Sequence, residues 1–408
     1  MGPHDEQRKP VTFFRWVFKR VRQKGAFYWG TVVALIVIGV FVGRWLEKQE
    51  FALELRYKLF KMVQSASPNK PFVQGTSVVL IGDEEYWKGD LARRIPIKRD
   101  YLAALLRRLD KADPAVIALD FDLRAQTPDG SYVMHPDYQD ETKQLLEAVR
   151  DVSKNRSVIL PKTMTRLKSG GYVTEPDIYD GFDFQGGKVR TGYIALPFDI
   201  RKVPLSQKLR DGGRVESFAE AIVRARNERA LDRVRDLESL PYGDYLEHGA
   251  FDVFSPADVL ANKPEVLDKL RHDIVIVGAG WSNRAYGRGG AADSYFTPVG
   301  PLQGALIHAN FVEALLGNRT SRPFGETALK VIEVIATLLV AVIFALISNP
   351  LGKFFSIVLL MAMLVLFSIF SRLNLGLFYD FFIPMLLVVV HAAYEQIREW
   401  QTHAHRVP

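Results

Sequence analysis

The 408-residue chain contains no cysteine, which excludes disulfide bonds and thiolate metal sites. Its eight histidines show no metal-ligand spacing, and the polar loop with Ser131, His135 and Asp137 does not resemble a nucleophile elbow. The turn Gly278-Ala279-Gly280 lacks the third glycine of a dinucleotide-binding fingerprint. From these absences we expect no bound metal, no cofactor and no enzymatic activity.

Charge and hydropathy are divided unevenly along the chain. A mean hydropathy of +0.01 and 24% charged residues suit a soluble protein, but they average two different kinds of sequence. A helix needs about 20 apolar residues to cross a hydrocarbon core. The sequence predicts four such helices, one before and three after a polar domain at residues 47–325: Phe27–Leu46, Ala328–Ile347, Phe354–Phe370 and Leu375–Ala393.

The flanking charges predict the orientation of these helices. Seven Lys and Arg residues lie between Arg8 and Lys24, and the acidic residues of this segment are only Asp5 and Glu6. Lys and Arg near the end of a span stay on the cytoplasmic side, so the N-terminal segment 1–26 should be cytoplasmic. Four spans then return the C-terminal segment 394–408 to the same side. The first apolar run is too long for a cleaved signal peptide and is followed by no small-residue cleavage site, so we interpret it as a retained anchor.

Segment 13–20 mixes aromatic and basic residues at nearly helical spacing. Such a helix can lie in the membrane surface, but the segment is equally typical of a basic flank that only sets topology. The net charge of +7 comes largely from the N-terminal segment 1–26, so the sequence does not indicate nucleic-acid binding.

The polar domain has the alternating pattern of an α/β fold with a mostly parallel sheet. Its first βαβ unit predicts parallel pairing of the first two strands and a right-handed crossover. Strands are predicted at 77–81, 115–119, 157–160 and 272–277, with an edge strand at 193–197. Helices are predicted at 100–112, 140–151, 215–228 and 304–316, and helix 47–63 should extend the first span onto this domain.

Aspartates follow two of the predicted strands. Asp83 follows the first strand, and Asp120 and Asp122 follow the second. Ligands of parallel sheets collect at the carboxyl ends of strands, where several oxygen atoms can bind a cation or a cationic ligand. The alternative is a structural role, in which these aspartates hold turns or pair with Arg94, Arg99 or Arg124.

Other isolated polar residues favour structural roles. His308 lies among apolar residues of its helix, where a lone histidine is more often a packing residue than a ligand. In the predicted spans, Lys330, Glu333, Asp380 and His391 lie near span ends, where reaching the interface or pairing locally is more common than lining a pathway.

The order of motifs resembles the second type of cyclase/histidine-kinase-associated sensory extracellular domain (CHASE2). The matches are a strand ending in Asp83-Glu84, the turn Ile95-Pro96-Ile97-Lys98-Arg99, the strand Val116–Asp122 and Asp199-Ile200-Arg201-Lys202-Val203-Pro204-Leu205. The closing block is the most specific: Ile274–Ala279, Asp293, Thr297-Pro298-Val299-Gly300, Gly304 and His308-Ala309-Asn310. One span before this region and three after it also resemble the family's layout.

The resemblance implies a sensory domain that binds a stimulus outside a bacterial inner membrane. It suggests Asp83, Asp120, Asp122, Arg99 and Asp293 as ligand-binding candidates. Structural roles are implied for eight motif residues: Pro96, Arg201, Pro204, Thr297, Pro298, Gly304, His308 and Asn310. The sequence departs from the family by lacking the tryptophans of the proline turn and by having only Glu395–Pro408 after the last predicted span.

These features leave two functional hypotheses. The first is a non-enzymatic receptor that signals through a separate protein, in which Asp83→Ala with Asp122→Ala should abolish ligand binding without unfolding. The second is a structural subunit of a homo-oligomeric membrane assembly, which those substitutions should leave intact. Under either hypothesis we expect the lipid bilayer and other copies of the chain as partners, but no nucleic acid.

Overall fold

The computed structural model describes residues 11–23, 25–46, 49–67, 72–91, 93–125, 137–235, 237, 239–282, 293–347 and 349–404. Ser131 and His135 lie outside this part. Contacts divide the chain into two compact units. One is a helical unit of residues 1–68 and 323–408, and the other is an α/β unit of residues 69–322.

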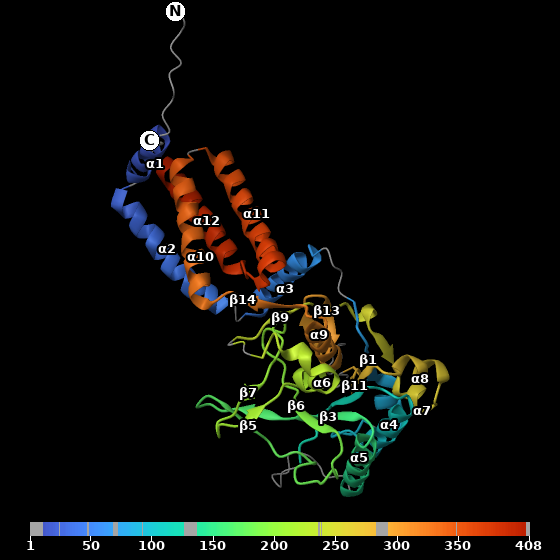
Figure 1. The fold of residues 1–408 in the computed structure, drawn as a ribbon. Helices are drawn as coiled ribbons and strands as arrows, with labels where there is room; N and C mark the ends of the chain where they lie inside the picture. Colours follow the sequence, from blue (N-terminus) through green and yellow to red (C-terminus); the bar gives the residue numbers. More distant parts are fainter. Residues whose placement is uncertain are drawn as a thin grey trace, which may run out of the picture. The chain divides into compact units, whose positions relative to one another are not determined.

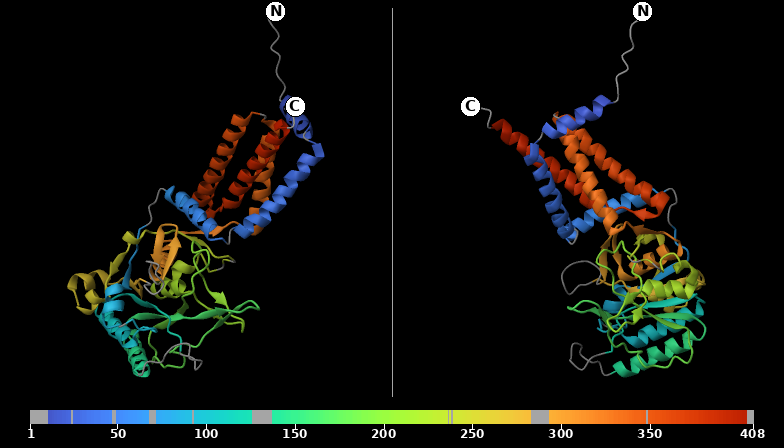
Figure 2. Two further views of the ribbon diagram at one scale, coloured as in Figure 1. Left: turned by 180° about the vertical axis from the view of Figure 1, so that it is seen from behind. Right: turned by 60° about the vertical axis from the view of Figure 1, so that its left-hand side comes forward.

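Four long helices of the helical unit lie side by side (Figures 1 and 2). Within the described residues, two of them are long and apolar enough to cross a membrane: Thr327–Leu346 and Pro350–Leu375. The spans expected at 27–46 and 375–393 therefore stay predictions, although both regions contain helix. The helices of this unit are α1 (Val11–Gln23), α2 (Gly25–Leu46), α3 (Glu50–Ser65), α10 (Glu326–Leu346), α11 (Pro350–Leu375) and α12 (Phe382–Ala404).

The boundary between the last two helices differs from the sequence prediction. Helix α11 continues to Leu375, where Gly376 ends it in a left-handed conformation with φ of 64°. Glycine adopts this conformation without steric cost, which makes it a frequent residue at helix ends. Asp380 consequently precedes α12 and pairs with Arg56 of α3 at 2.8 Å. Predicting the fourth helix from residue 375 was wrong because hydropathy alone does not show this turn.

Helix α3 is separate from α2 and contacts other parts of the helical unit. Gln49 precedes it in an extended conformation, and the ring of Phe60 packs edge-to-face on Phe378 at 4.9 Å. The sequence predicted one continuous helix that extends onto the outer domain. The apolar spacing that suggested a packed face included Phe51 and Leu55, but these side chains are 65% and 48% exposed, whereas Ala52, Tyr57 and Phe60 are buried.

A six-stranded parallel sheet forms the centre of the α/β unit, as the sequence predicted. The strand order is β10-β1-β11-β2-β3-β6, and every neighbouring pair in it is parallel. The strands are β1 (Thr76–Ile81), β2 (Val116–Asp120), β3 (Ser157–Lys162), β6 (Val189–Tyr193), β10 (Asp252–Phe254) and β11 (Ile274–Ala279).

The last long strand, β11, lies between the first two. Val277 pairs with Val79 of β1 on one side and with Leu119 of β2 on the other. The predicted direct pairing of the first two strands was therefore wrong, although both are parallel to β11. A local βαβ pattern does not exclude the insertion of a strand from much later in the chain. Short β10 was missed, and the predicted edge strand lies earlier, at β6.

Helices cover both faces of this sheet. Figures 1 and 2 show α4 and α5 on one face and α6 and α9 on the other. Alternate strand residues such as Val79, Leu119 and Val277 belong to the buried core under α4 and α5. The helices are α4 (Arg99–Lys111), α5 (Tyr138–Ser153), α6 (Phe218–Asn227), α7 (Pro256–Leu260), α8 (Pro264–Leu270) and α9 (Gly304–Leu316).

Short antiparallel strands occupy the connections. The hairpin of β12 and β13 turns at Pro298-Val299 and leads directly into α9. The remaining short strands are β4 (Met164–Arg166), β5 (Tyr172–Thr174), β7 (Gln207–Lys208), β8 (Arg214–Val215), β9 (Tyr242–Gly243), β12 (Ser294–Thr297), β13 (Gly300–Gln303), β14 (Thr320–Pro323) and β15 (Leu377–Phe378).

The absence of a side chain at Gly278 allows α9 to approach the sheet closely. A Cβ atom at this position would lie 2.5 Å from the Cβ of Ala305. We expect Gly278→Ala to destabilise the α/β unit by about 1–3 kcal/mol, the usual cost of overpacking. Hydrogen exchange of the slowest β11 amides in the full chain measures this loss. Ala305→Gly should restore part of it, because it removes the opposing methyl group.

Candidate functional site

The approach of α9 places His308 beside the carboxyl end of β2. Gly278 pairs with Asp120, the last residue of β2. His308 lies one turn into α9, and its Nε2 is 3.8 Å from Oδ1 of Asp120, too far for a hydrogen bond. From the sequence, His308 was predicted to be a packing residue. It does pack against Phe218, with ring centroids 5.0 Å apart, but it also faces this carboxylate.

A cavity of about 280 Å³ opens at this edge of the sheet, and we call it the acidic cavity. Its polar wall consists of three carboxylates, a phenol and an imidazole, and the other lining residues are apolar or glycine. No lysine or arginine is among the lining residues that the structure describes. They are Asp120, Phe121, Asp122, Ile194, Leu196, Ala279, Trp281, Asp293, Tyr295, Gly304 and His308.

Two buried polar atoms in this wall have no hydrogen-bond partner among the described residues. They are Oδ2 of Asp120 and Nδ1 of His308, and the His308 ring also interacts with the backbone of Ile194, which opposes the effect of burial on its pKa. The two residues are only 8% and 2% exposed. Buried polar groups in folded proteins are nearly always hydrogen-bonded, because an unmade bond there costs about 1–3 kcal/mol. The unpartnered atoms therefore indicate a place where a bound molecule completes the bonding.

Burial dominates the protonation of the acidic cavity. It raises the pKa of Asp120 well above its ordinary value, and the nearby charge of Asp293 adds to this effect. Burial also raises the pKa of Asp293, although hydrogen bonds from Tyr295 and the Gly304 backbone oppose the change. Desolvation lowers the pKa of His308 to about 4. The imidazole is therefore neutral at pH 7 and contributes no positive charge.

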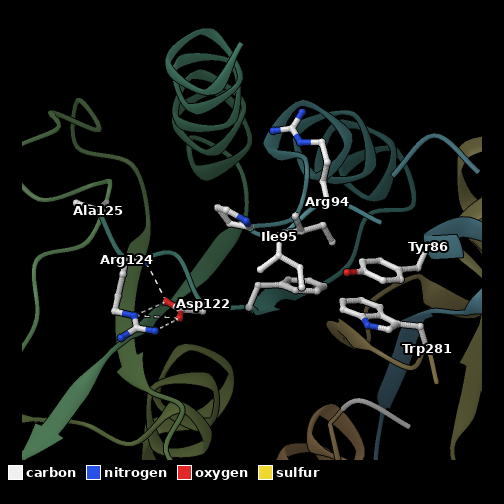
Figure 3. Close-up of a pocket in the computed structure, with 10 residues that line it drawn as sticks. Tyr86, Arg94, Ile95, Asp122, Arg124, Ala125 and Trp281 are labelled. Atoms are coloured by element: carbon white, nitrogen blue, oxygen red, sulfur yellow. Dashed lines mark hydrogen bonds and ion pairs between the residues drawn. The ribbon is translucent and has the colours of Figure 1, made fainter. Parts of the chain in front are cut away.

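A second cavity of about 250 Å³ shares Phe121, Asp122 and Trp281 with the first, and we call it the apolar cavity (Figure 3). The ring of Tyr86 stacks on Trp281 at a centroid distance of 4.1 Å and forms one wall. Its remaining lining residues are Arg94, Ile95, Pro96, Ile97, Arg124 and Ala125.

The cations of the apolar cavity are already paired with carboxylates. Arg94 binds both oxygens of Glu141, and Arg124 binds Asp122 and Glu175. Figure 3 shows the bonds between Arg124 and Asp122. These pairs place protein carboxylates where an anionic ligand would have to bind.

The structure brings together only part of the candidate set. Asp120, Asp122 and Asp293 line the acidic cavity, as the strand-end interpretation and the family motif suggested. Asp83 instead accepts hydrogen bonds from the backbone and side chain of Ser282, which ties the ends of β1 and β11 together. Arg99 is 1% exposed, bonds to Tyr138 and Thr142, and is not among the residues that line either cavity.

The remaining motif residues hold the framework around these cavities. Arg201 is fully buried and pairs with Asp199 at 2.8 Å. Asn310 donates a hydrogen bond to the Leu306 carbonyl within α9. It also accepts one from the backbone N–H of Leu246, which lies outside this helix. The other roles are local. Pro204 accepts a bond from Ser217, Thr297 and Pro298 form the hairpin turn, Gly304 leaves room for Asp293, and Pro96 lines the apolar cavity.

Sequence reasoning missed two aromatic residues of the site. Trp281 borders both cavities and Tyr295 bonds to Asp293. The position of Trp281 directly after the β11 glycines was a usable signal, because that position is also a strand end. Tyr295 carried no such signal, because it lies at the start of β12, next to Asp293, and not at the carboxyl end of a strand of the parallel sheet.

The family model of the CHASE2 domain matches residues 32–347, more than half of the chain. The chain belongs to this family of extracellular sensory domains, as the motif order implied. No curated protein and no solved structure matches the chain.

Proposed function

We propose that this chain is a non-enzymatic membrane sensor. Its α/β unit lies outside a bacterial inner membrane and binds a small-molecule stimulus in the acidic cavity, and the signal passes to a separate protein. The observation that carries this proposal is the buried Oδ2 of Asp120, which has no hydrogen-bond partner among the described residues and lines a cavity of a sensory-family domain.

The course of the chain supports a route from the cavity to the membrane helices. Helix α9 starts at the cavity with Gly304 and His308, and only β14 and a short connection separate it from α10. The buried Glu313 of α9 accepts bonds from Thr76 and Gln74 at the start of β1, at 2.6 and 2.8 Å. A ligand beside His308 thus contacts an element that is packed along its length and continues toward a span.

The family of the chain favours binding over catalysis. The described lining residues of the two cavities include no serine, threonine or lysine; aspartate, tyrosine and histidine can also act as nucleophiles, so the sensory family of the chain is what favours binding. The alternative hypothesis of a structural subunit does not require a cavity with unpartnered polar atoms. It predicts that filling the cavity has no effect on the partners of the chain.

Filling the acidic cavity tests the proposed function. A photo-crosslinking residue replaces the exposed Trp16 or Ile397, in the two segments expected on the cytoplasmic side, and cells carry the full chain. We expect a cross-link to another protein whose yield changes when Leu196→Trp fills the cavity. Phe198→Trp is the matched control, because Phe198 is 64% exposed and is not among the lining residues. Equal yields in the two variants would contradict the sensor hypothesis.

A further inference from the structure

The charge balance of the acidic cavity favours a positively charged ligand. Asp120, Asp122 and Asp293 line it, His308 is neutral at pH 7, and burial raises the pKa of Asp120 and Asp293, a change that a nearby cation would oppose. Arg124 offsets Asp122 from outside this cavity, with Nη1 bound to Glu175 at 3.1 Å. Among the described residues, the basic group that approaches Asp120 is the neutral imidazole of His308, at 3.8 Å. A cation inside the cavity would supply the missing partner.

The shape and chemistry of the wall favour an organic cation over a metal ion. Within the described residues, no group of three His, Asp or Glu side chains is arranged to hold a metal. A hard metal cation needs several oxygen ligands at short distance. The cavity instead has an apolar wall made of Phe121, Ile194, Leu196, Ala279 and Trp281. Aromatic faces also attract ammonium ions within about 6 Å.

From this arrangement we infer that the acidic cavity binds a small organic ammonium ion, an amine with an apolar substituent. Its N–H groups bond to the carboxylates of Asp120 and Asp293, and its apolar part packs against Phe121, Leu196 and Trp281. The inference rests on the proposed function, since it names the class of stimulus for the same cavity.

Binding of such an ion is linked to pH. The groups that face Asp120 are Asp122, Asp293, Tyr295 and His308. Burial raises the pKa of Asp120, so this carboxyl group keeps its proton to a higher pH than an exposed aspartate does. The ammonium ion needs the carboxylate, and its binding therefore releases that proton to solvent. We expect the affinity for the amine to rise between pH 6 and pH 8.

Calorimetry on the full chain in detergent micelles tests the inference with five probes. Ethylamine, butylamine and 2-phenylethylamine test the amine class. 2-Phenylethanol tests whether charge is needed, and magnesium chloride tests for a metal site. We expect saturable binding of at least one amine, with affinity rising from pH 6 to pH 8, and at least tenfold weaker binding in Asp120→Asn. The alcohol and magnesium should not bind in the cavity. Asp140→Asn, on the exposed face of α5, removes the same charge elsewhere and should change nothing.

Three outcomes would overturn the ligand class: no amine binds, the alcohol or magnesium binds in place of the amine, or Asp120→Asn binds the amine as tightly as the wild type. These outcomes are separable from failure of the proposed function. If Leu196→Trp still changes the cross-link when no amine binds, only the ligand class is wrong. If Leu196→Trp and Phe198→Trp cross-link equally, the sensor hypothesis itself fails.

Discussion

Asp199→Asn should destabilise the α/β unit by about 3–5 kcal/mol, the usual cost of removing one partner from a buried ion pair. Arg201 is fully buried, and its Nε and Nη2 atoms each donate to the Asp199 carboxylate at 2.8 Å. Asparagine keeps the shape of the side chain but removes the Asp199 charge that binds two guanidinium nitrogens of Arg201. Urea unfolding of the full chain in micelles, followed by hydrogen exchange at β11, measures the loss.

An exposed ion pair provides the control for this substitution. Asp268 and Arg271 are 69% and 58% exposed and lie 3.1 Å apart. Asp268→Asn should change stability by no more than about 0.5 kcal/mol, because water screens such pairs. Replacing both buried partners, with Asp199→Leu and Arg201→Met, should cost less than Asp199→Asn alone. If Asp199→Asn cost as little as Asp268→Asn, the pair would not organise this region.

His308 should make the α/β unit lose stability on acidification. Burial lowers its pKa to about 4 in the folded chain, against about 6.5 in the unfolded chain. Between these values the unfolded state binds more protons, so stability falls as the pH falls from 6.5 to 4. At about 1.4 kcal/mol for each pKa unit, the contribution lost is about 3 kcal/mol. The same unfolding experiment at several pH values measures it.

The comparison with His308→Gln isolates this contribution. Asp120 acts in the opposite direction, because its raised pKa favours the folded state at low pH. Both proteins retain Asp120, so the difference between their pH profiles reports His308. The exposed His248, changed to Gln, should leave the profile unaltered. A His308→Gln profile parallel to that of the wild type would show that the imidazole is not held neutral by burial.

The general architecture of the α/β unit was predictable because each strand and helix carried its own periodic signal. Strands such as 77–81 and 272–277 read as buried apolar runs, and α4 showed a clear apolar face. The sheet order was not predictable in full, because the position of β11 between β1 and β2 depends on pairing across nearly 200 residues. The end of α11 depended on the left-handed conformation of Gly376, which hydropathy does not measure.

The residues of the candidate site that follow strand ends were predictable from the strand pattern. The others were predictable only from the family motif. Asp120 and Asp122 were placed at the correct edge because parallel strands end together. Asp293 lies on a hairpin that has no strand-end signal, so only the motif suggested it. Asp83 shares the strand-end pattern but bonds to Ser282. The substitution that tests ligand binding is therefore Asp120→Asn, in place of Asp83→Ala with Asp122→Ala.

As a binding residue, Asp120 should be kept by the fold at a cost to the stability of the α/β unit. A buried carboxylate without a partner destabilises a folded protein, and asparagine removes the charge while it retains the shape. The decisive measurement is the unfolding free energy of the α/β unit in full-length Asp120→Asn, without added ligand. We expect an increase of about 1–3 kcal/mol at pH 8 that shrinks at pH 5. A decrease, as expected for Asp199→Asn, would contradict the claim and assign Asp120 a structural role.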